Sequence, residues 1–319
     1  MQTIAERMGQ RQYPGHLGIE IETETTNPYQ VPNIPGWKCI NDGSLRDFGK
    51  EYITNGPVEI DKLDKSLKNW KDGLGEIHNR FRRDSISTSV HVHANVQDHT
   101  ALQALNFYLC GVLVENVMSH FAGPDRIGNL FCLRTIDAED HYNTIRKGVV
   151  QASDDLGLLR AFNTTNYKYS NINTIPITEK GSLEFRIMRG TVDTDEINIW
   201  ASSVRGVQEF AKQFDNPVAI VRAMKDLGVD GLLQKVFGDN LNHFKYQNYE
   251  KDVLKNFIYV ADMATCRKDW DIKAGEQTKP KKRVPEVGIN WEALRGGEQP
   301  AAVPEPVIQW DEDFEEEDM

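Results

Sequence analysis

Acidic and imidazole side chains recur in this sequence with a spacing of two. Glu20 and Glu22 alternate with apolar residues, and so do His91 and His93. Side chains of a β-strand point to opposite faces with this period, so each pair shares one face of a strand. Like charges about 7 Å apart on one face are unfavourable unless water or a cation relieves them. A divalent metal site is one interpretation; a solvated acidic strand and a half-buried structural histidine pair are the alternatives.

A further strand pattern places an acidic residue two positions before a basic one. In residues 181–191, Glu184 and Arg186 alternate with apolar side chains. Such a pair can be a surface ion pair worth under about 1 kcal/mol. It can also combine a metal ligand with a phosphate-binding guanidinium, because the planar fork of arginine matches phosphate oxygens. The spacing alone leaves both interpretations open.

Sequence periodicity predicts the elements that carry these residues. Alternation of apolar and polar residues predicts strands, with a polar connection and no strand over 25–40; the predicted strands are 17–24, 51–54, 85–96, 167–175 and 181–191. Apolar residues at helical spacing predict helices over 63–74, 98–121, 196–214, 217–237 and 248–265. Asp98 is the expected N-cap of the second helix, and Glu115 and His120 are expected on its surface. The expected fold class is α+β.

Composition limits the class of protein. The chain has 319 residues and a formal net charge of -11, so it lacks the basic excess of a general nucleic-acid binder. Four widely separated cysteines favour reduced thiols over a disulfide framework or a zinc knuckle. No apolar run approaches the roughly 20 residues of a membrane span, and no secretion signal is evident. We therefore expect a cytoplasmic protein with no membrane or nucleic-acid partner.

The composition changes beyond residue 270. Residues 271–319 contain a basic cluster at 279–283, several prolines and a final acidic run that includes Trp310 and Phe314. Such a segment cannot bury enough apolar surface to offset the entropy lost on ordering, so we expect a disordered tail, basic and then acidic. The acidic end is either solvated or a docking peptide for a basic protein partner.

Four motifs stand in a recognisable order between about Leu17 and Trp200. They are Gly18–Glu22, Asp42–Ser44 with Glu51, Val90–His93, and Glu184–Arg186 with Gly190–Thr191. This ordered set resembles the amidoligase family, a branch of the carboxylate-amine ligases that includes glutamine synthetase and glutamate-cysteine ligase. The resemblance implies a glutamine synthetase-like fold, a curved antiparallel sheet with helices on its outer face and a concave polar face that holds ATP and divalent metals.

The same resemblance implies how the chain is divided. A catalytic sheet domain would occupy residues 1–200, a C-terminal helical segment packed on it would occupy 201–270, and the disordered tail would be 271–319. Family members occur in bacteria and tailed phages, so a phage origin and action in the host bacterial cytoplasm are the corresponding expectations.

Roles for individual residues also follow from the resemblance. The implied metal ligands are Glu20, Glu22, Glu51, His91 and Glu184. The implied catalytic residues are Arg186, which would neutralise the transferred phosphoryl group, together with Glu184 and His91. The residues implied to contact nucleotide or substrate are Asp42, Ser44, His93, Arg126, Lys168, Asn173 and Arg189. The implied cofactors are ATP and Mg²⁺ or Mn²⁺.

Two residues depart from the pattern of the family. Glu24 extends the acidic row and is either a further ligand or a solvated side chain. Arg189 follows Arg186 by three positions, so it would reach the same face only across a bulge or at a strand end.

The implied reaction joins a carboxylate to an amine after ATP has converted the carboxylate to an acyl phosphate. Such phosphoryl transfer depends on positioning and on neutralisation of oxygen charge, so the absence of a side-chain nucleophile pattern is no objection. The substrates would be small-molecule or peptide carboxylates and amines. Two alternatives remain: a small-molecule kinase on the same scaffold, and a non-catalytic assembly adaptor that acts through the acidic tail.

Overall fold

Six antiparallel strands form a single sheet in the described part of the chain. The computed structural model describes residues 2–82, 85–163 and 168–270. The strand order across the sheet is β2-β3-β1-β4-β6-β5, and every neighbouring pair is antiparallel. The strands are β1 (Leu17–Thr23), β2 (Trp37–Ile40), β3 (Lys50–Thr54), β4 (Ser89–Asn95), β5 (Ile172–Asn173) and β6 (Ser182–Arg189).

The register of the central strands collects the polar side chains on one face. Glu20 of β1 lies opposite His91 of β4, and His93 of β4 lies opposite Glu184 of β6. On the other side of β1, Glu22 lies opposite Glu51 of β3. Since side chains alternate between faces, the apolar residues between these positions point to the opposite face of the sheet.

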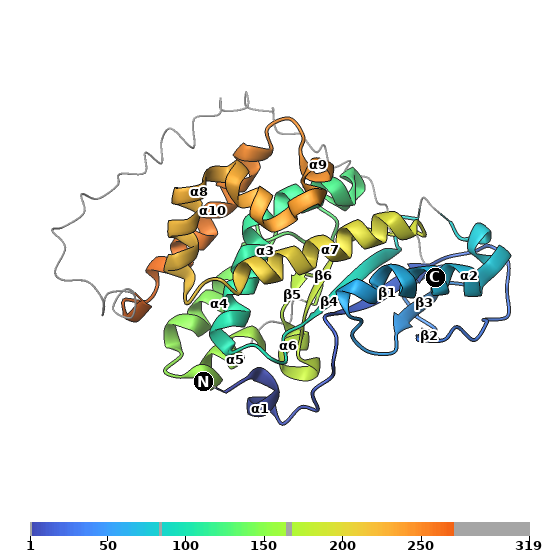
Figure 1. Ribbon diagram of the computed structural model, residues 1–319, viewed down its shortest axis with the longest axis horizontal. Coiled ribbons are helices and arrows are strands. Elements are labelled where there is room, and N and C mark those ends of the chain that lie inside the picture. Colours follow the sequence, from blue (N-terminus) through green and yellow to red (C-terminus); the bar gives the residue numbers. More distant parts are fainter. Residues whose placement is uncertain (1, 83–84, 164–167, 271–319) are drawn as a thin grey trace, which may run out of the picture. The chain divides into compact units, whose positions relative to one another are not determined.

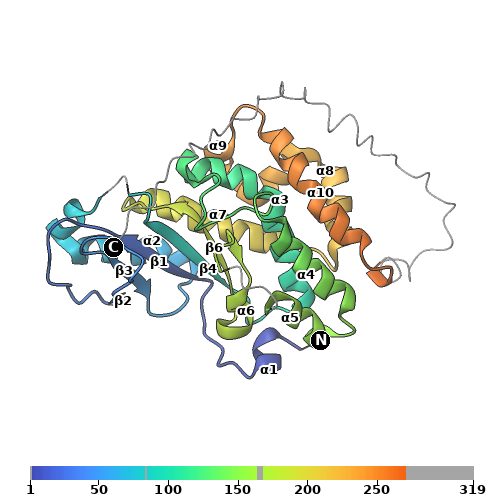
Figure 2. The ribbon, with the colours of Figure 1, turned by 180° about the vertical axis from the view of Figure 1, so that it is seen from behind.

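Three helices cover the apolar face. They are α2 (Leu63–Leu74), α3 (Ala101–Ala122) and α7 (Thr194–Ala211), and Figures 1 and 2, which view the chain from opposite sides, show α7 crossing one side of the sheet only. A capping box between Thr100 and Gln103 begins α3, so Thr100 and not the expected Asp98 is the N-cap. Gly111 lets α3 approach the sheet closely, because a Cβ there would lie 3.2 Å from the ring of Phe185.

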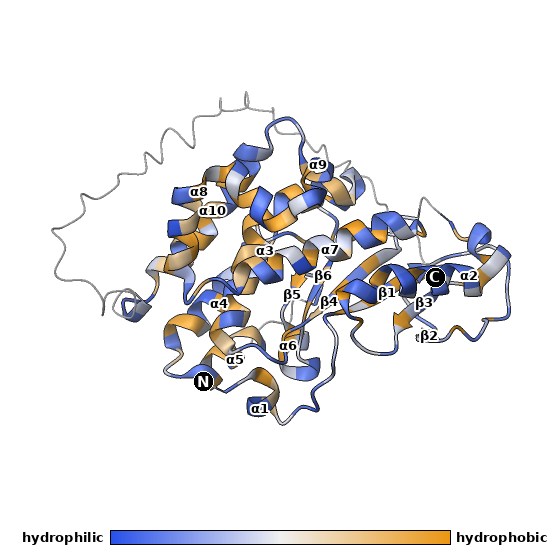
Figure 3. Ribbon diagram, in the orientation of Figure 1, coloured by the Kyte–Doolittle hydropathy of each residue, from blue (hydrophilic) through white to orange (hydrophobic). Residues whose placement is uncertain are grey.

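The remaining helices pack beside this layer. They are α1 (Ile4–Met8), α4 (Glu139–Gln151), α5 (Asp155–Asn163), α6 (Ile175–Lys180), α8 (Pro217–Phe237), α9 (Leu241–Phe244), α10 (Tyr249–Thr265) and the short 3-10 helices η1 (Ile60–Lys62), η2 (Gly75–Arg80), η3 (Pro124–Arg126) and η4 (Gly238–Asn240). Helices α8 and α10 contact α3 and each other, and Figure 3 shows apolar segments along these helices. Residues 1–274 form one compact unit, and the boundary expected at residue 200 lies inside α7.

A bulge in β6 lies beside the polar residues. Between two paired positions, β6 advances by three residues where β4 advances by two. Asn171 satisfies both bulged amides: its carbonyl accepts from Arg186 N at 2.9 Å, and its Oδ1 accepts from Ile187 N at 3.0 Å. The guanidinium of Arg126 satisfies the carbonyls, with Nε donating to Ile187 O at 3.0 Å and Nη2 to Arg186 O at 3.2 Å. The bulge is therefore held by hydrogen bonds from two other segments.

The structure confirms the α+β class and corrects several element boundaries. Strand β2 forms within the connection in which no strand was expected, and helices α4 and α5 were not predicted. The strand expected over 85–96 begins at Ser89, and the strand expected over 167–175 is reduced to Ile172–Asn173. The expected disordered tail, 271–319, lies outside the described residues.

One core helix also has the composition of a membrane span. Contrary to the sequence expectation, α3 is long and apolar enough to cross a bilayer by length and composition, with a mean hydropathy of 1.3. Of the residues in that apolar window 89% are buried, which is typical of the core helix of a globular domain.

Candidate active site

A carboxylate, an imidazole and a second carboxylate converge on the polar face of the sheet. Glu20, His93 and Glu184 come from three adjacent strands, and one ligand atom from each lies within 4.8 Å of the others. His93 Nε2 is 2.9 Å from Glu20 Oε1 and 3.7 Å from Glu184 Oε1. The contact with Glu20 is an ion pair without the alignment of a hydrogen bond. We call these three residues the donor set.

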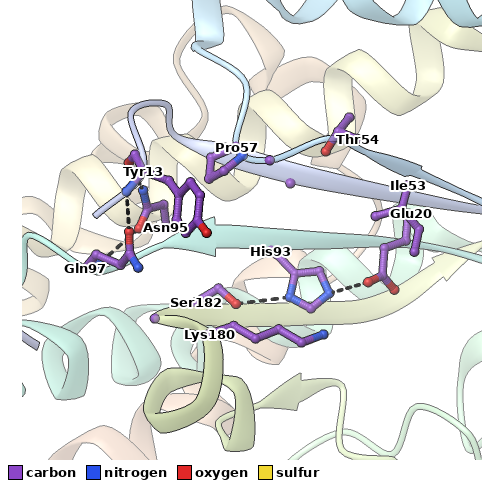
Figure 4. Close-up of a pocket in the computed structure, with 13 residues that line it drawn as sticks. Tyr13, Glu20, Ile53, Thr54, Pro57, His93, Asn95, Gln97, Lys180 and Ser182 are labelled. Atoms are coloured by element: carbon purple, nitrogen blue, oxygen red, sulfur yellow. Dashed lines mark hydrogen bonds and ion pairs between the residues drawn. The ribbon is translucent and has the colours of Figure 1, made fainter. Parts of the chain in front are cut away.

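Neighbouring side chains orient each member of the donor set. Ser182 Oγ lies 3.1 Å from Nδ1 of His93, which leaves Nε2 directed at the carboxylates; Figure 4 shows His93 between Ser182 and Glu20. Asn173 Nδ2 donates to Glu184 Oε2 at 2.6 Å, and Arg186 Nη1 donates to Glu184 Oε1 at 2.5 Å. Partners of this kind fix the rotamers of metal-binding residues.

His91 is engaged at both ring nitrogens. Its Nδ1 is 3.1 Å from Glu20 Oε2, and its Nε2 is 2.7 Å from Ser89 Oγ. Ser89 in turn donates to Glu22 Oε2 at 2.6 Å. His91 therefore links two carboxylates of β1, and its Nδ1 is also 3.5 Å from Glu184 Oε1. His93, implied by the resemblance as a nucleotide or substrate contact, is the histidine of the donor set.

Burial and charge pull the pKa values of the donor set in opposite directions. Burial is the largest single influence and would raise the pKa of Glu20 and of Glu184, but His93 and His91 together, with Arg186 in the case of Glu184, outweigh it and lower the pKa of both. Burial would lower the pKa of His93, but Glu184 and Glu20 raise it. Without a cation, the three side chains thus form a buried, mutually compensating ion cluster, which has a substantial desolvation cost.

The face carries more negative charge than this cluster can neutralise. Burial, followed by the charges of Glu20 and Glu22, raises the pKa of Glu51 to about 8. Asp42 is close enough to contribute to the same shift. Crowded carboxylates of this kind either retain a proton or bind a cation.

An apolar pocket lies at one end of the polar face. It has a volume of about 230 Å³, and glycines at positions 18, 56 and 181 leave parts of its wall without side chains. Figure 4 shows Tyr13, Ile53 and Pro57 around this pocket and the Lys180 side chain running beside His93. Because Glu20 and His93 also line it, the pocket opens directly onto the donor set.

A second, smaller pocket lies at the other end, and we call it the arginine pocket. Its volume is about 70 Å³, and it is lined by Glu22, Ser44, Ser87, Ser89, Arg126, Phe131, Tyr169 and Arg186. Arg126 is 4% exposed and forms no ion pair with any residue that the structure describes. Arg186 Nε is buried and has no hydrogen-bond partner within the described ranges. A buried guanidinium without a carboxylate partner favours binding of an anion.

Three further residues were implied as nucleotide or substrate contacts: Asp42, Ser44 and Lys168. Asp42 and Ser44 form an Asx turn in which Ser44 N donates to Asp42 Oδ1 at 2.8 Å. Lys168 is exposed, and its Nζ lies 4.8 Å from the ring centroid of Tyr169. Tyr169, and not Lys168, lines the arginine pocket.

Arg189 and Glu24 lie outside the site. Arg189 donates to the carbonyls of Phe121 and Ala122 at the end of α3 and pairs with Glu196 at 2.5 Å. The bulge expected for Arg189 is present, but it does not turn this side chain into the arginine pocket. Glu24 is not the solvated side chain that was one alternative: it is 1% exposed and accepts hydrogen bonds from two serines and one backbone amide, Ser85, Ser87 and Arg46 N.

Sequence reasoning missed a buried support behind the bulge. Glu115, expected at the surface, is 1% exposed, and its Oε1 accepts from Asn171 Nδ2 at 2.9 Å. Its Oε2 accepts from Thr135 N at 2.8 Å. Asn171 therefore connects this carboxyl to the bulge that carries Arg186. Ser89 and Ser182 were also missed as partners of histidines, although the alternating pattern already placed Ser89 on the histidine face.

Comparison with known proteins assigns no family. No protein-family model matches the chain, and no curated protein matches it in sequence.

Proposed function

We propose that this protein is an ATP- and divalent-metal-dependent carboxylate-amine ligase, an amidoligase on a glutamine synthetase-like sheet. One observation supports this most: the apolar pocket, the donor set and the arginine pocket follow one another along the polar face of the sheet. A nucleoside triphosphate has the same order of parts, with an apolar base, phosphates that bind metal and a terminal phosphoryl group that needs cationic neutralisation.

The donor set fits a small divalent cation. Two carboxylates are the ligands that Mg²⁺ prefers, while an imidazole extends the choice to Mn²⁺ and other transition metals. The compensating ion cluster gives the same indication, since a cation would replace the proton on His93 as the counter-charge of Glu20 and Glu184. When bound, such an ion supplies charge neutralisation for phosphate oxygens.

The chain's own residues then have distinct tasks. Tyr13, Ile53 and Pro57 would enclose the base, and Lys180 would lie beside the phosphates nearest to it. Arg186, which bonds Glu184 of the donor set and also lines the arginine pocket, would face the terminal phosphoryl group, and Arg126 would hold the acceptor carboxylate in that pocket. Both groups are anionic and repel each other, so the two guanidiniums would make their approach favourable.

The proposed reaction has two steps. First, a carboxylate oxygen attacks the terminal phosphorus of ATP, the bond to the bridging oxygen breaks, and ADP leaves. Second, an amine nitrogen attacks the acyl carbon, phosphate leaves with its oxygen, and the nitrogen loses a proton to give the amide. A kinase on the same scaffold would stop after a single transfer. The arginine pocket favours an anionic acceptor over the neutral hydroxyl of most small-molecule kinase substrates.

Calorimetry on four proteins tests the binding part of the proposal. We expect wild type to bind Mn²⁺, and to bind a non-hydrolysable ATP analogue only when the metal is present. Glu184→Gln should weaken metal binding by about 10-fold or more, since it removes one anionic ligand. Arg186→Gln should weaken the analogue more than the metal, because Asn173 still holds Glu184 when the guanidinium is removed. Glu250→Gln, which changes an exposed glutamate of α10, is the matched control. Metal affinity unchanged by Glu184→Gln would contradict the proposal.

A chemical trap separates the ligase from the kinase. Hydroxylamine converts an acyl phosphate to a hydroxamate, whereas a phosphate ester does not react. We therefore expect carboxylate-dependent release of ADP together with hydroxamate formation when mixed carboxylates are supplied with ATP and Mg²⁺ or Mn²⁺. ADP release with a stable phosphorylated product and no hydroxamate would favour the kinase instead.

A further inference from the structure

The arginine pocket is small, but its surroundings are unusually apolar. Its volume is about 70 Å³, against about 230 Å³ for the apolar pocket at the other end of the same face. Two of its lining residues, and three residues next to lining residues in sequence, are nevertheless large, apolar and exposed. We call them the apolar collar: Ile86 is 58% exposed, Ile127 36%, Leu130 74%, Phe131 57% and Tyr169 40%.

Two members of the collar line the pocket, and the other three adjoin lining residues in sequence. Phe131 and Tyr169 line it, with their ring centroids 5.6 Å apart in an edge-to-face arrangement. Ile86, Ile127 and Leu130 each adjoin a lining residue in sequence, namely Ser87, Arg126 and Phe131. Hydrogen bonding joins two of these segments, because Arg126 Nη1 donates to the carbonyl of Ile86 at 3.5 Å.

Such a concentration of exposed apolar groups indicates a binding surface. The described residues include 13 large hydrophobic side chains with high exposure; two of them line this pocket, and three more adjoin its lining residues in sequence. Single exposed apolar residues are ordinary, but several of them beside a polar pocket are typical of protein or peptide recognition. The lining holds two guanidiniums against one carboxylate, Glu22. Arg186 pairs with Glu184 through Nη1 but leaves its buried Nε unpaired, and Arg126 donates only to backbone carbonyls among the described residues, so the pocket favours an anion.

We propose that the arginine pocket receives an acidic side chain of a polypeptide, and that the apolar collar contacts apolar residues flanking that side chain. This inference rests on the proposed function only for the fate of the carboxylate, which would become the acid that is amidated. A pocket with room for little more than the carboxylate end of a side chain, with two exposed aromatic residues in its wall, fits an acid presented on a larger apolar body. A free small acid would leave the collar uncovered.

The occupant must satisfy both parts of the surface. Its carboxylate pairs with the guanidiniums, and the two flanking apolar side chains replace water on the collar. Neither part is expected to suffice, because a single exposed ion pair contributes little and the apolar contacts alone carry no selectivity for acid. Recognition should therefore need the charge and the apolar flanks together.

Peptide binding to the full chain tests this inference. The probe is a capped, fluorescently labelled pentapeptide with the sequence Ala-Leu-Glu-Phe-Ala, measured by anisotropy with and without Mn²⁺ and a non-hydrolysable ATP analogue. One matched peptide carries Gln for Glu, and another carries Ser for both Leu and Phe. We expect the first peptide to bind and each matched peptide to bind at least about fivefold more weakly.

Surface variants place the binding on the collar. Leu130→Ser and Phe131→Ser should each weaken the probe by about fivefold or more, because the apolar flanks lose their contact. Leu254→Ser, which changes a 39% exposed leucine of α10, is the matched control and should leave binding unchanged. All three positions are exposed, so the variants should fold as wild type does.

The outcomes separate this inference from the proposed function. Selective peptide binding that the collar variants weaken supports the inference even if no nucleotide binds, in which case the ligase proposal fails alone. Nucleotide binding without peptide binding overturns the inference and leaves the ligase proposal standing. Equal affinity for the probe and for free acetate or benzoate, with no effect of Leu130→Ser, would identify a small-acid pocket and also overturn it. Self-association that Leu130→Ser abolishes, with no peptide binding, would assign the collar to a second copy of the chain.

Discussion

Replacing Glu115 with glutamine tests whether one buried carboxyl makes this fold sensitive to pH. Glu115 lies in α3, behind the bulge of β6, and accepts hydrogen bonds from Asn171 and the amide of Thr135. Burial raises the pKa of Glu115 to about 7, although both donors and Arg134 act in the opposite direction. The folded protein therefore retains a proton at pH values where the unfolded chain has lost it.

The sign and the size of the effect follow from linkage. The stabilising contribution of the protonated carboxyl is fully present below the unfolded pKa, near 4.5, and is lost as the pH rises through the folded pKa, near 7. Over the interval from pH 5 to pH 8, a shift of this size corresponds to about 2.5 kcal/mol of unfolding free energy. Glu115→Gln removes the titration. The NH₂ group of the glutamine would face one of the two donors, Asn171 Nδ2 or the amide of Thr135. The resulting loss of unfolding free energy is the same at every pH.

Urea denaturation of wild type and Glu115→Gln at several pH values is the assay. We expect the unfolding free energy of the variant, minus that of wild type, to increase by about 2.5 kcal/mol from pH 5 to pH 8. Glu250→Gln, an exposed change in α10, should show no such trend. A difference that stays constant across this range would mean that the hydrogen bonds keep Glu115 ionised, and the reasoning from burial would be refuted.

Three further substitutions test the site and its supports. Ser182→Ala removes the partner of His93 Nδ1 and should lower Mn²⁺ affinity by about 10-fold in calorimetry; unchanged affinity would mean that the serine does not orient the imidazole. Gly18→Val should reduce binding of the ATP analogue but not of Mn²⁺, because the new side chain fills the apolar pocket while its Cβ meets His93 Cβ at an ordinary 3.4 Å; equal loss of both would indicate distortion of β1. Gly190→Ala should cost about 1–3 kcal/mol in urea denaturation, since a Cβ there would lie 1.9 Å from Thr88 Oγ1; wild-type stability would show that this segment shifts easily.

The alternation of apolar and polar residues was sufficient to predict that the central strands β1, β4 and β6 exist. Alternation is strict in β1 and β4 and holds in β6 as far as Ile187, because one face of each strand packs against helices, so the pattern is visible without any knowledge of partners. Strand β2 has no such signal. Trp37 is 5% exposed while Ile40 is 44% exposed, so its apolar residues do not share one face, and its pairing with β3 supplies the order that its own sequence does not.

The bulge had a sequence signal that periodicity analysis did not use. Ile187 and Met188 are consecutive apolar residues at the end of an alternating strand, and both are fully buried. A regular strand cannot direct two successive side chains to the same core, so a break in alternation of this kind indicates an extra residue. The partners that hold the bulge, Asn171 and Arg126, come from segments remote in sequence and could not be assigned from spacing.

Within the site, spacing predicted the face but not the geometry on it. Glu20, His91, His93 and Glu184 were all expected on one polar surface, and they lie there. Which histidine joins the carboxylates depends on rotamers, and these are decided by Ser89 and Ser182 through hydrogen bonds across strands. Glu115 was placed at the surface because an acidic residue in a helix is normally exposed, and only tertiary packing of α3 beneath other helices overrides that preference.

The order of pockets along the face is a consequence of antiparallel register. Gly18 lies opposite His93, and Glu20 lies opposite His91, so the donor set runs diagonally across the strands. The position opposite His93 lacks a side chain, which opens space for the apolar pocket on that side. A slip of one residue between β1 and β4 would turn Glu20 toward the core and expose Ile19 or Ile21, so the packing of the apolar face also fixes the chemistry of the polar face. The same burial that stabilises the sheet therefore positions the residues proposed to bind metal and phosphate.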